Sequence, residues 1–463
     1  MSGEDESLCR LGAQALLDGY LAGEFQPSQV VDAYLARIAR LDSKLHAYVI
    51  VLADEARAQA EASDLRYRAS TARALEGLPI ALKDLIELAG YDTTAGSATR
   101  RGLPPSTITS TIANRLVDAG AVLLGKVHTA EFAFGAWGDN EHMGTPWNPW
   151  DLQVQHTPGG SSSGSGVAVA ACMAPVAIGT DTGGSVRIPA GFNGLVGLKT
   201  TTGRISAYGV IPLSQTLDTP GVLARSVTDA ALIYGVLQGH DDLDPRTWSR
   251  PKPVPTTLPL DDLSDLRLAC LCEVDRVGID EDVLAAYDRC LGLLESLGAS
   301  IVILTLERPL ISYAEPTPMA VEAFALYGEL AQDPSSLMDP QVRKRVLGGN
   351  VSATEYLKIR EVMTAQTVDF HRRLIGLDAF ILPTSQVPAV PLSGIGTRPN
   401  ASLLTRFGNT FGLCGVAMPS GYNHAGLPLS LQILCRGYQE DSAMRIASAL
   451  EIRTSDERHY PEL

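Results

Sequence analysis

With 463 residues, of which 45% are hydrophobic and 19% charged, the chain has the composition of a globular protein with a large core and not of a disordered segment. The formal net charge of −15 disfavours a nucleic-acid partner, because an acidic surface repels phosphate groups. An acidic N-terminus and the lack of any apolar run of about 18 residues predict a cytoplasmic protein that does not bind membranes.

Helix and strand signals alternate through the N-terminal half. Apolar side chains recur with helical spacing and predict a helix over residues 28–41, with Ser28 as its N-cap. Short β-rich runs predict strands over residues 78–82 and 121–127. Asp, Pro and Thr then crowd residues 241–265, which we expect to form a surface connection within one fold.

The C-terminal half predicts a βαβ unit. A strand over residues 266–272, a helix over 281–297 and a strand over 300–306 follow one another, so the two strands should pair in parallel. No G-x-G-x-x-G lies between the first strand and the helix, which argues against a dinucleotide site. Helices are predicted within residues 318–376 and a short buried strand over 379–383.

Neither the cysteines nor the histidines of the chain form a recognisable site. The seven cysteines contain no Cys-x-x-Cys pair and lie mostly in apolar segments, so we expect them to be reduced core residues. His128, His142 and His156 do not have the spacing of metal ligands. We therefore expect no metal and no other cofactor.

Residues 159–187 carry the strongest chemical signal. They join a Gly-Gly-Ser-Ser-Ser-Gly loop to a run of small apolar residues and to Gly-Thr-Asp-Thr-Gly-Gly-Ser-Val-Arg, so that hydroxyls and backbone N–H groups can converge as acyl transfer requires. A phosphate-binding loop does not fit, because no Gly-Lys-Ser/Thr follows Gly159 or Gly183. Residues 160–164 match the G-x-S-x-G nucleophile elbow, which would make Ser162 the nucleophile, but the preceding segment is turn-rich where an elbow needs a strand.

One lysine near the first predicted strand is a second chemical candidate. Lys83 ends the apolar run Pro-Ile-Ala-Leu-Lys, and a desolvated lysine there can lose its proton near neutral pH and act as a general base. The alternative is an ordinary ion pair with the adjacent Asp84. The local sequence alone favours the ion pair.

Three segments together resemble the amidase signature family of serine hydrolases. They are Gly-Leu-Pro-Ile-Ala-Leu-Lys ending at Lys83, Thr-Pro-Gly-Gly-Ser-Ser-Ser-Gly-Ser from Thr157, and Gly-Thr-Asp-Thr-Gly-Gly-Ser-Val-Arg from Gly179. The likeness extends to Gly-Leu-Pro-Leu-Ser-Leu-Gln ending at Gln432 and covers nearly the whole chain. It implies an α/β amidase signature fold, in which helices cover both faces of a large central mixed β-sheet.

The resemblance also implies a Ser-cisSer-Lys triad. Matching the motifs assigns the nucleophile to Ser185, the bridging serine to Ser161 and the base to Lys83. Like the family's bridging serine, Ser161 directly follows the Gly-Gly pair, and the peptide bond between Gly160 and Ser161 would be cis. Ser162 then becomes a scaffold residue.

The same motifs imply the groups that support the triad. Ser163 is expected to form a hydrogen bond within the site. Asp181 and Arg187 are expected to form a scaffold ion pair, although Arg187 could instead meet a carboxylate of the substrate. The oxyanion of the reaction is expected to face the backbone N–H groups of Thr182, Gly183, Gly184 and Ser185.

The implied activity is hydrolysis of a small linear carboxylic amide to a carboxylate plus ammonia or an amine. The pocket is expected along residues 134–137, 383–390 and 407–411, where aromatic side chains suit a small acyl or aryl group. A urea-derived amide of the biuret or allophanate type is an alternative substrate.

Two other kinds of protein remain possible alternatives to a free-standing hydrolase. The glutaminase subunit of a tRNA-dependent amidotransferase shares the triad, but such subunits read Asp-Gln-x-Gly-Pro where this chain has Asp-Thr-Pro-Gly from Asp218. A non-catalytic binding protein is disfavoured because all three triad positions are intact. We therefore favour the hydrolase.

We expect one amidase domain over residues 1–463, with a small amide and a second copy of the chain as its partners. Its parts would be an N-terminal helical region (1–65), a signature core with the triad (66–240), the surface connection (241–265) and a C-terminal half that completes the sheet and the pocket (266–463).

Overall fold

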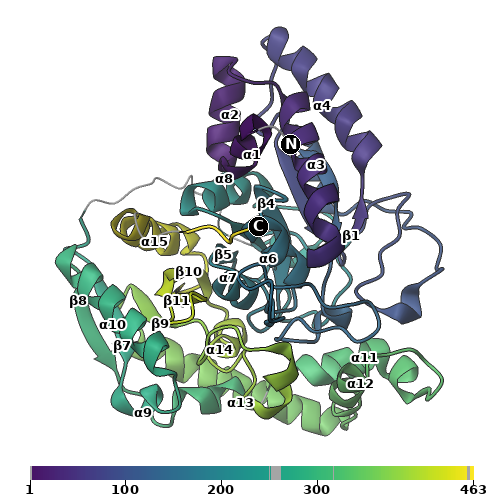
Figure 1. Ribbon diagram of the computed structural model, residues 1–463. Helices are drawn as coiled ribbons and strands as arrows, with labels where there is room; N and C mark the ends of the chain where they lie inside the picture. Colours follow the sequence, from purple (N-terminus) through teal and green to yellow (C-terminus); the bar gives the residue numbers. More distant parts are fainter. Residues whose placement is uncertain (1–2, 250, 252–261, 316, 456–458) are drawn as a thin grey trace.

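One mixed sheet runs through the molecule in the computed structural model, which describes residues 3–249, 251, 262–315, 317–455 and 459–463 (Figure 1). The strands follow the order β1-β3-β2-β4-β6-β5-β10-β11-β9-β7-β8. Strand β2 pairs in parallel with β3 and β4, and β7 pairs in parallel with β8 and β9. The other pairs are antiparallel. The expected mixed α/β sheet is thus confirmed.

The bounds of the elements are as follows. The strands are β1 (Tyr48–Val51), β2 (Pro79–Lys83), β3 (Val122–Val127), β4 (Val176–Asp181), β5 (Val196–Lys199), β6 (Thr219–Ala224), β7 (Arg267–Leu271), β8 (Ser300–Leu304), β9 (Ala379–Pro383), β10 (Cys414–Tyr422) and β11 (Pro428–Cys435). The α-helices are α1 (Gly3–Arg10), α2 (Ala13–Ala22), α3 (Pro27–Leu45), α4 (Ala53–Arg68), α5 (Thr111–Asp118), α6 (Ser163–Ala170), α7 (Arg187–Phe192), α8 (Val227–Leu237), α9 (Glu273–Arg276), α10 (Glu281–Ser296), α11 (Met319–Gln332), α12 (Pro340–Leu347), α13 (Ala353–Arg373), α14 (Arg406–Thr410) and α15 (Glu440–Thr454).

Helices cover both faces of the sheet. Helices α5, α8, α15 and α10 contact one another in series, with α8 on β6 and α15 on β10 and β11. Helices α6 and α7 contact each other and pack on β4, β5 and β10. Figure 1 shows the N-terminal helices α1–α4 at the top of the molecule and α11–α13 at the bottom, with the sheet between them. The central strands are buried and form the core.

Most predicted elements are present with boundaries shifted by one or two residues. The strands expected over residues 78–82 and 121–127 are β2 and β3. The predicted βαβ unit corresponds to β7, α10 and β8, and β7 and β8 pair in parallel as expected. The short buried strand is β9.

The start of α3 differs from the sequence prediction. The helix begins at Pro27, and its N-cap is Gln26, which forms a capping box with Gln29, so Ser28 is not the cap. The ring of proline presets the backbone for the first helical position, which moves the start one residue earlier. The Ser28 hydroxyl instead donates to the Asp64 carboxylate on α4, at 2.6 Å.

The expected surface connection is described only in part, because residues 252–261 lie outside the described residues. A 3₁₀ turn spans Pro245–Thr247, and Asp244 beside it is buried.

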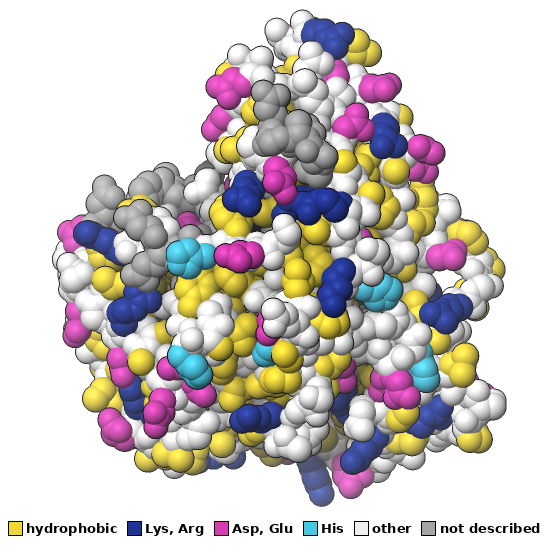
Figure 2. Space-filling view, viewed as in Figure 1, with side chains coloured by type: hydrophobic (Ala, Val, Ile, Leu, Met, Phe, Trp, Pro, Cys, Tyr) yellow, Lys and Arg dark blue, Asp and Glu magenta, His cyan; other side chains and the backbone are white. Residues whose placement is uncertain are grey.

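On the face shown in Figure 2, acidic and basic side chains are interspersed among polar and hydrophobic ones. Within the described residues, no helix combines the length and the apolar character that crossing a bilayer requires.

Candidate active site

Lys83 is the last residue of β2 and is fully buried. Its Nζ lies 2.7 Å from Ser161 Oγ and 2.8 Å from Thr180 Oγ1. Burial lowers the pKa of Lys83 to about 7, although the charges of Asp218 and Asp181 raise it in part. The alternative ion pair with Asp84 does not form, because the Asp84 carboxylate lies 2.7 Å from Nζ of Lys126.

Ser161 reaches Lys83 from the loop before α6. The peptide bond between Gly160 and Ser161 is cis, as the resemblance implies. A side chain at Gly160 would place its Cβ only 2.2 Å from the backbone oxygen of Gly135, so the close approach of the two loops requires glycine there. The backbone N–H of Ala130 holds the Ser161 carbonyl oxygen at 3.1 Å.

Ser185 lies on the turn between β4 and α7, and 7% of it is exposed, into a pocket. The backbone N–H of Ser162 donates to the Ser185 carbonyl oxygen at 3.2 Å, which joins the two serine loops. Among the described residues, the Ser161 hydroxyl contacts Lys83, and no hydrogen bond links Ser161 Oγ to Ser185 Oγ. Catalytic hydrogen bonds often close only when substrate is bound.

One of the four expected oxyanion donors was predicted wrongly. The N–H of Gly184 is directed to Asp181 Oδ1 at 2.7 Å, so it is not free to meet an oxyanion. Gly184 has φ +128°, and a Cβ there would lie 2.1 Å from Thr405 Oγ1, which explains why glycine stands at this position. The N–H groups of Thr182, Gly183 and Ser185 donate to no residue in the described part of the chain, and these three residues line the pocket.

Asp181 and Arg187 form a buried ion pair, with Arg187 Nε 3.0 Å from Asp181 Oδ2. Arg187 also donates to Asn409 Oδ1 at 2.7 Å and to Gln432 Oε1 at 2.8 Å. Burial alone would raise the pKa of Asp181, but the charge and hydrogen bonds of Arg187 outweigh it and hold the pKa well below its usual range. Arg187 does not line the pocket, so the alternative contact with a substrate carboxylate does not fit the structure.

The other two serines of the loop lie outside the pocket. Ser162 Oγ lies 3.3 Å from both the backbone nitrogen and the backbone oxygen of Thr180 on β4, which fits a scaffold residue and not an elbow nucleophile. The expected hydrogen bond of Ser163 is absent: its buried hydroxyl has no partner among the described residues. Ser163 opens α6, and its side chain is enclosed at the start of that helix.

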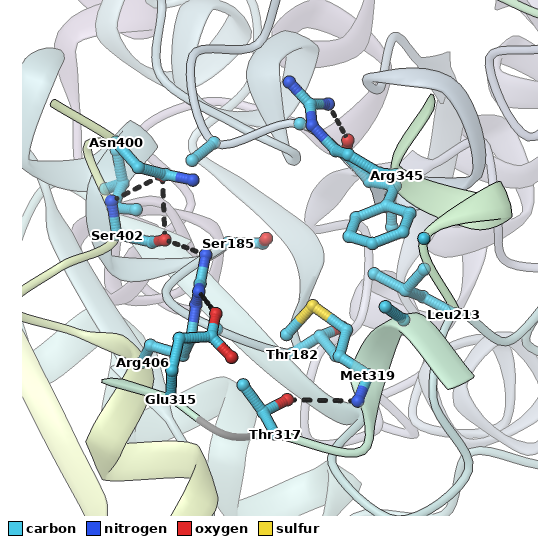
Figure 3. A pocket seen from close by; sticks show the side chains of 18 residues that line it. Thr182, Ser185, Leu213, Glu315, Thr317, Met319, Arg345, Asn400, Ser402 and Arg406 are labelled. Carbon is cyan, nitrogen blue, oxygen red and sulfur yellow. Dashed lines mark hydrogen bonds and ion pairs between the residues drawn. The ribbon is translucent and has the colours of Figure 1, made fainter. Parts of the chain in front are cut away.

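A pocket of about 350 Å³ opens beside Ser185 (Figure 3). Of the three expected lining regions, only residues 134–137 contribute, through Phe134, Gly135 and Ala136. Phe407 and Phe411 instead pack in the core with Phe370, and the loop 383–390 borders a separate small cavity. The expectation for these two regions was therefore wrong.

The remaining lining comes from segments that carry no motif. These residues include Leu213, Glu315, Thr317, Met319, Arg345, Asn400, Ser402 and Arg406. Arg345 follows Arg343 and Lys344 on α12, so in the sequence it resembles part of a solvated charged face. No local signal separates it from its neighbours.

Comparison with known proteins gives the family. A family model described as Amidase matches residues 29–444. The chain belongs to the amidase family. Members of this family act on C–N amide bonds as hydrolases, and so does this amidase-family chain.

Its relatives include the A subunit of glutamyl-tRNA(Gln) amidotransferase. The chain is 34% identical to that of Geobacter metallireducens, over 93% of this chain and 95% of the relative, and 37% identical to that of Myxococcus xanthus, over 93% and 94%. These names refer to an enzyme with tRNA in its reaction and more than one subunit. They conflict with the expectation that no nucleic acid is involved.

Solved structures of the same fold cover almost the entire chain. One belongs to a vestigial protein complex that reveals the evolutionary origins of an s-triazine catabolic enzyme, with a TM-score of 0.89 at 29% identity, and covers 98% of this chain and 100% of its own. The peptide amidase from Stenotrophomonas maltophilia has a TM-score of 0.83 at 29% identity and covers 98% of each chain. The amidase signature fold is therefore confirmed.

Proposed function

We propose that this protein hydrolyses a small carboxylic amide through a serine acyl-enzyme, with Ser185 as nucleophile, Ser161 as proton relay and Lys83 as general base. The observation that carries the proposal is the buried contact of 2.7 Å between Lys83 Nζ and Ser161 Oγ, beside a pocket that exposes Ser185. A lysine with a pKa of about 7 is neutral in about half of the molecules at pH 7, and the neutral amine can accept a proton.

In the proposed first step, Ser185 Oγ attacks the amide carbonyl carbon. The Ser185 proton moves to the Ser161 oxygen while the Ser161 proton moves to neutral Lys83. The N–H groups of Thr182, Gly183 and Ser185 stabilise the oxyanion, and losing one such donor typically costs about 3 kcal/mol of barrier.

In the second step, the C–N bond breaks and the proton on Lys83 returns through Ser161 to the leaving nitrogen. This releases ammonia or an amine and leaves Ser185 acylated. Water then attacks the ester, gives its proton to Lys83 through Ser161, and the carboxylate leaves as Ser185 regains its proton.

A fluorophosphonate probe tests the nucleophile. We expect covalent labelling of Ser185, identified by mass spectrometry of peptides, and no labelling in Ser185→Ala. Ser162→Ala is the matched variant, because Ser162 lies in the neighbouring loop and outside the pocket. Labelling that persists in Ser185→Ala and disappears in Ser162→Ala would refute the assignment.

A second candidate function follows from the relatives that are named as the A subunit of the amidotransferase. On this proposal, the same triad releases ammonia from glutamine for a partner protein that acts on aminoacyl-tRNA. Two measurements on protein purified from the native host distinguish these candidate functions: light scattering gives the mass of the assembly, and an assay of ammonia release gives the activity. The free-standing hydrolase should be active alone, and we propose that it forms a homodimer of twice 49.2 kDa, whereas the amidotransferase component would release ammonia from glutamine only with its partner.

One structural neighbour comes from a complex that reveals the origins of an s-triazine catabolic enzyme. This likeness supports a urea-derived amide as an alternative substrate. A panel of primary amides, anilides, hydrazides, biuret and allophanate tests this directly. Activity confined to biuret or allophanate would favour the alternative over a carboxylic amide.

A further inference from the structure

The pocket beside Ser185 contains a cation that lacks a carboxylate partner. Arg345, on α12, lines the pocket and donates from one terminal nitrogen to the backbone oxygen of Phe134. In the described part of the chain, no carboxylate oxygen lies within 4.0 Å of its guanidinium. The other N–H groups of the Arg345 guanidinium donate to no residue in the described part of the chain.

The other charged side chains of the pocket are already paired. Arg406 forms an ion pair with Glu315, and it donates to Ser402 Oγ at 3.0 Å (Figure 3). Glu315 is the one acidic residue among the described residues that line the pocket. Among the described lining residues, Arg345 is thus the cation that has no carboxylate within 4.0 Å, and the one carboxylate is already paired.

Two carboxylates act on Arg345 from beyond 4.0 Å: the charges of Asp139 and Asp339 raise the pKa of its guanidinium in part. Asp339 is the N-cap of α12 and accepts from the backbone N–H groups of Gln341 and Val342, at 2.8 and 3.2 Å. Asp139 lies outside the pocket lining. Burial has the largest effect and lowers the pKa of the Arg345 guanidinium in spite of these two charges.

Apolar side chains contribute a large part of the pocket lining. Phe134, Leu213 and Met319 line this space together with the small residues Ala133 and Ala136. Such walls suit a short chain of methylene groups, and a pocket of about 350 Å³ suits a small ligand.

We propose that the substrate is an anionic half-amide of a short dicarboxylic acid, with its carboxylate bound by Arg345 and its amide carbon at Ser185. This inference rests on the proposed function. It separates the substrate from glutamine, whose ammonium group would find no free carboxylate in the lining.

Three amides of similar length test the proposal. Glutaramate is glutamine without its ammonium group, and pentanamide lacks the carboxylate as well. We expect kcat/KM for glutaramate to exceed that for pentanamide by about 10- to 100-fold, as one charge-assisted contact allows. Glutamine should be hydrolysed no better than pentanamide.

Two variants on α12 assign the preference to a residue. Arg345→Gln should reduce the ratio of kcat/KM between glutaramate and pentanamide to about one, mainly through KM, and Arg345→Lys should restore part of it. Arg343→Gln is the matched control, because Arg343 donates to the backbone oxygens of Ala331, Asp333 and Ser336 and lies outside the pocket. It should leave the ratio unchanged.

Calorimetry separates this inference from the proposed function. Glutaramate should bind Ser185→Ala, and binding should be lost when Arg345→Gln is added but not when Arg343→Gln is added. If glutaramate binds in this way but no amide is hydrolysed, the proposed function fails and the binding site stands. Glutaramate hydrolysed no faster than pentanamide, a glutamine rate equal to the glutaramate rate, or an Arg345→Gln variant with an unchanged ratio would overturn the inference.

Discussion

The chemical role of a buried lysine in this protein depends on its hydrogen-bond partners. Lys83 and Lys199 are both fully buried, and burial lowers the pKa of Lys83 to about 7 and that of Lys199 to about 8. Lys199 donates to the backbone oxygens of Thr200 and Leu413. Lys83 instead contacts the hydroxyls of Ser161 and Thr180, and a hydroxyl can pass on a proton where a carbonyl cannot.

The roles of Lys83 and Ser161 lead to unequal effects of substitution. Lys83→Ala should lower kcat/KM for the best amide by about 1,000-fold or more, because it removes the base, whereas Ser161→Ala should retain more activity if water replaces the relay. Ser165→Ala is a matched control, because Ser165 is buried on α6 and donates to the backbone oxygen of Ile178, at 3.2 Å. Near-normal turnover of Lys83→Ala would refute its role as base.

The pH dependence of the reaction should follow Lys83. Protonated Lys83 cannot accept a proton, so kcat/KM should fall as the pH drops through about 7 and reach a plateau above it. The negative charge of Asp218 raises the pKa of Lys83, so Asp218→Asn should move the midpoint to lower pH. A profile measured from pH 5 to 9 that shows no inflection near 7 would contradict the assignment.

Among the elements, the turn between β4 and α7 is held by two hydrogen bonds and an ion pair. Asp181 Oδ1 accepts from the N–H of Gly184, Asp181 Oδ2 accepts from that of Val186, and Arg187 neutralises the carboxylate. The turn that presents Ser185 is therefore shaped by one buried carboxylate and its cation, and not by glycine alone.

Removing the cation should destabilise the protein strongly. Arg187→Met leaves the Asp181 carboxylate buried and unpaired, which typically costs about 3 to 5 kcal/mol of the free energy of unfolding. Arg57→Met removes an ion pair to Asp32 that is exposed on both sides and should cost about 1 kcal/mol or less. Urea unfolding measures both, and an equally small loss for Arg187→Met would contradict the assigned role.

The positions of several elements could be predicted from the sequence alone. The periodic or apolar runs at β2, β3 and α10 are local signals, so their positions could be predicted to within a few residues. The motif positions pointed to Lys83 and Ser161, and the fold brings these two into contact.

The pocket could not be predicted in the same way. Glu315, Arg345 and Arg406 come from three separate segments, and only long-range packing brings them around Ser185. The N–H of Gly184 was misjudged because its direction depends on where the Asp181 carboxylate lies, which no local pattern encodes.

For the molecule as a whole, a continuous sheet links the two halves of the chain. Strand β5, from the N-terminal half, pairs with β10 from the C-terminal half, and Gln432 on β11 accepts a hydrogen bond from Arg187 on α7. The hydrophobic core likewise contains residues from both halves. We therefore propose that the two halves form a single domain.

A single domain should unfold in one transition. The four tryptophans, Trp137, Trp147, Trp150 and Trp248, all precede the C-terminal half (266–463) and report on the first part of the chain by fluorescence, while far-UV circular dichroism reports on all helices and strands. We expect the two thermal unfolding curves to coincide. A fluorescence transition clearly separate from that of circular dichroism would show two independent units.

The contacts of Arg187 also determine when the site can be completed during synthesis. Arg187 is held by Asn409 and Gln432, which leave the ribosome more than 200 residues after it, as the sequence separations of 222 and 245 residues show. A nascent chain that already contains Lys83, Ser161 and Ser185 therefore still lacks two of the groups that hold Arg187 in place beside the nucleophile turn. Release of the nearly finished polypeptide, and not translation of the serine motifs, is the moment at which we expect the cell to gain activity.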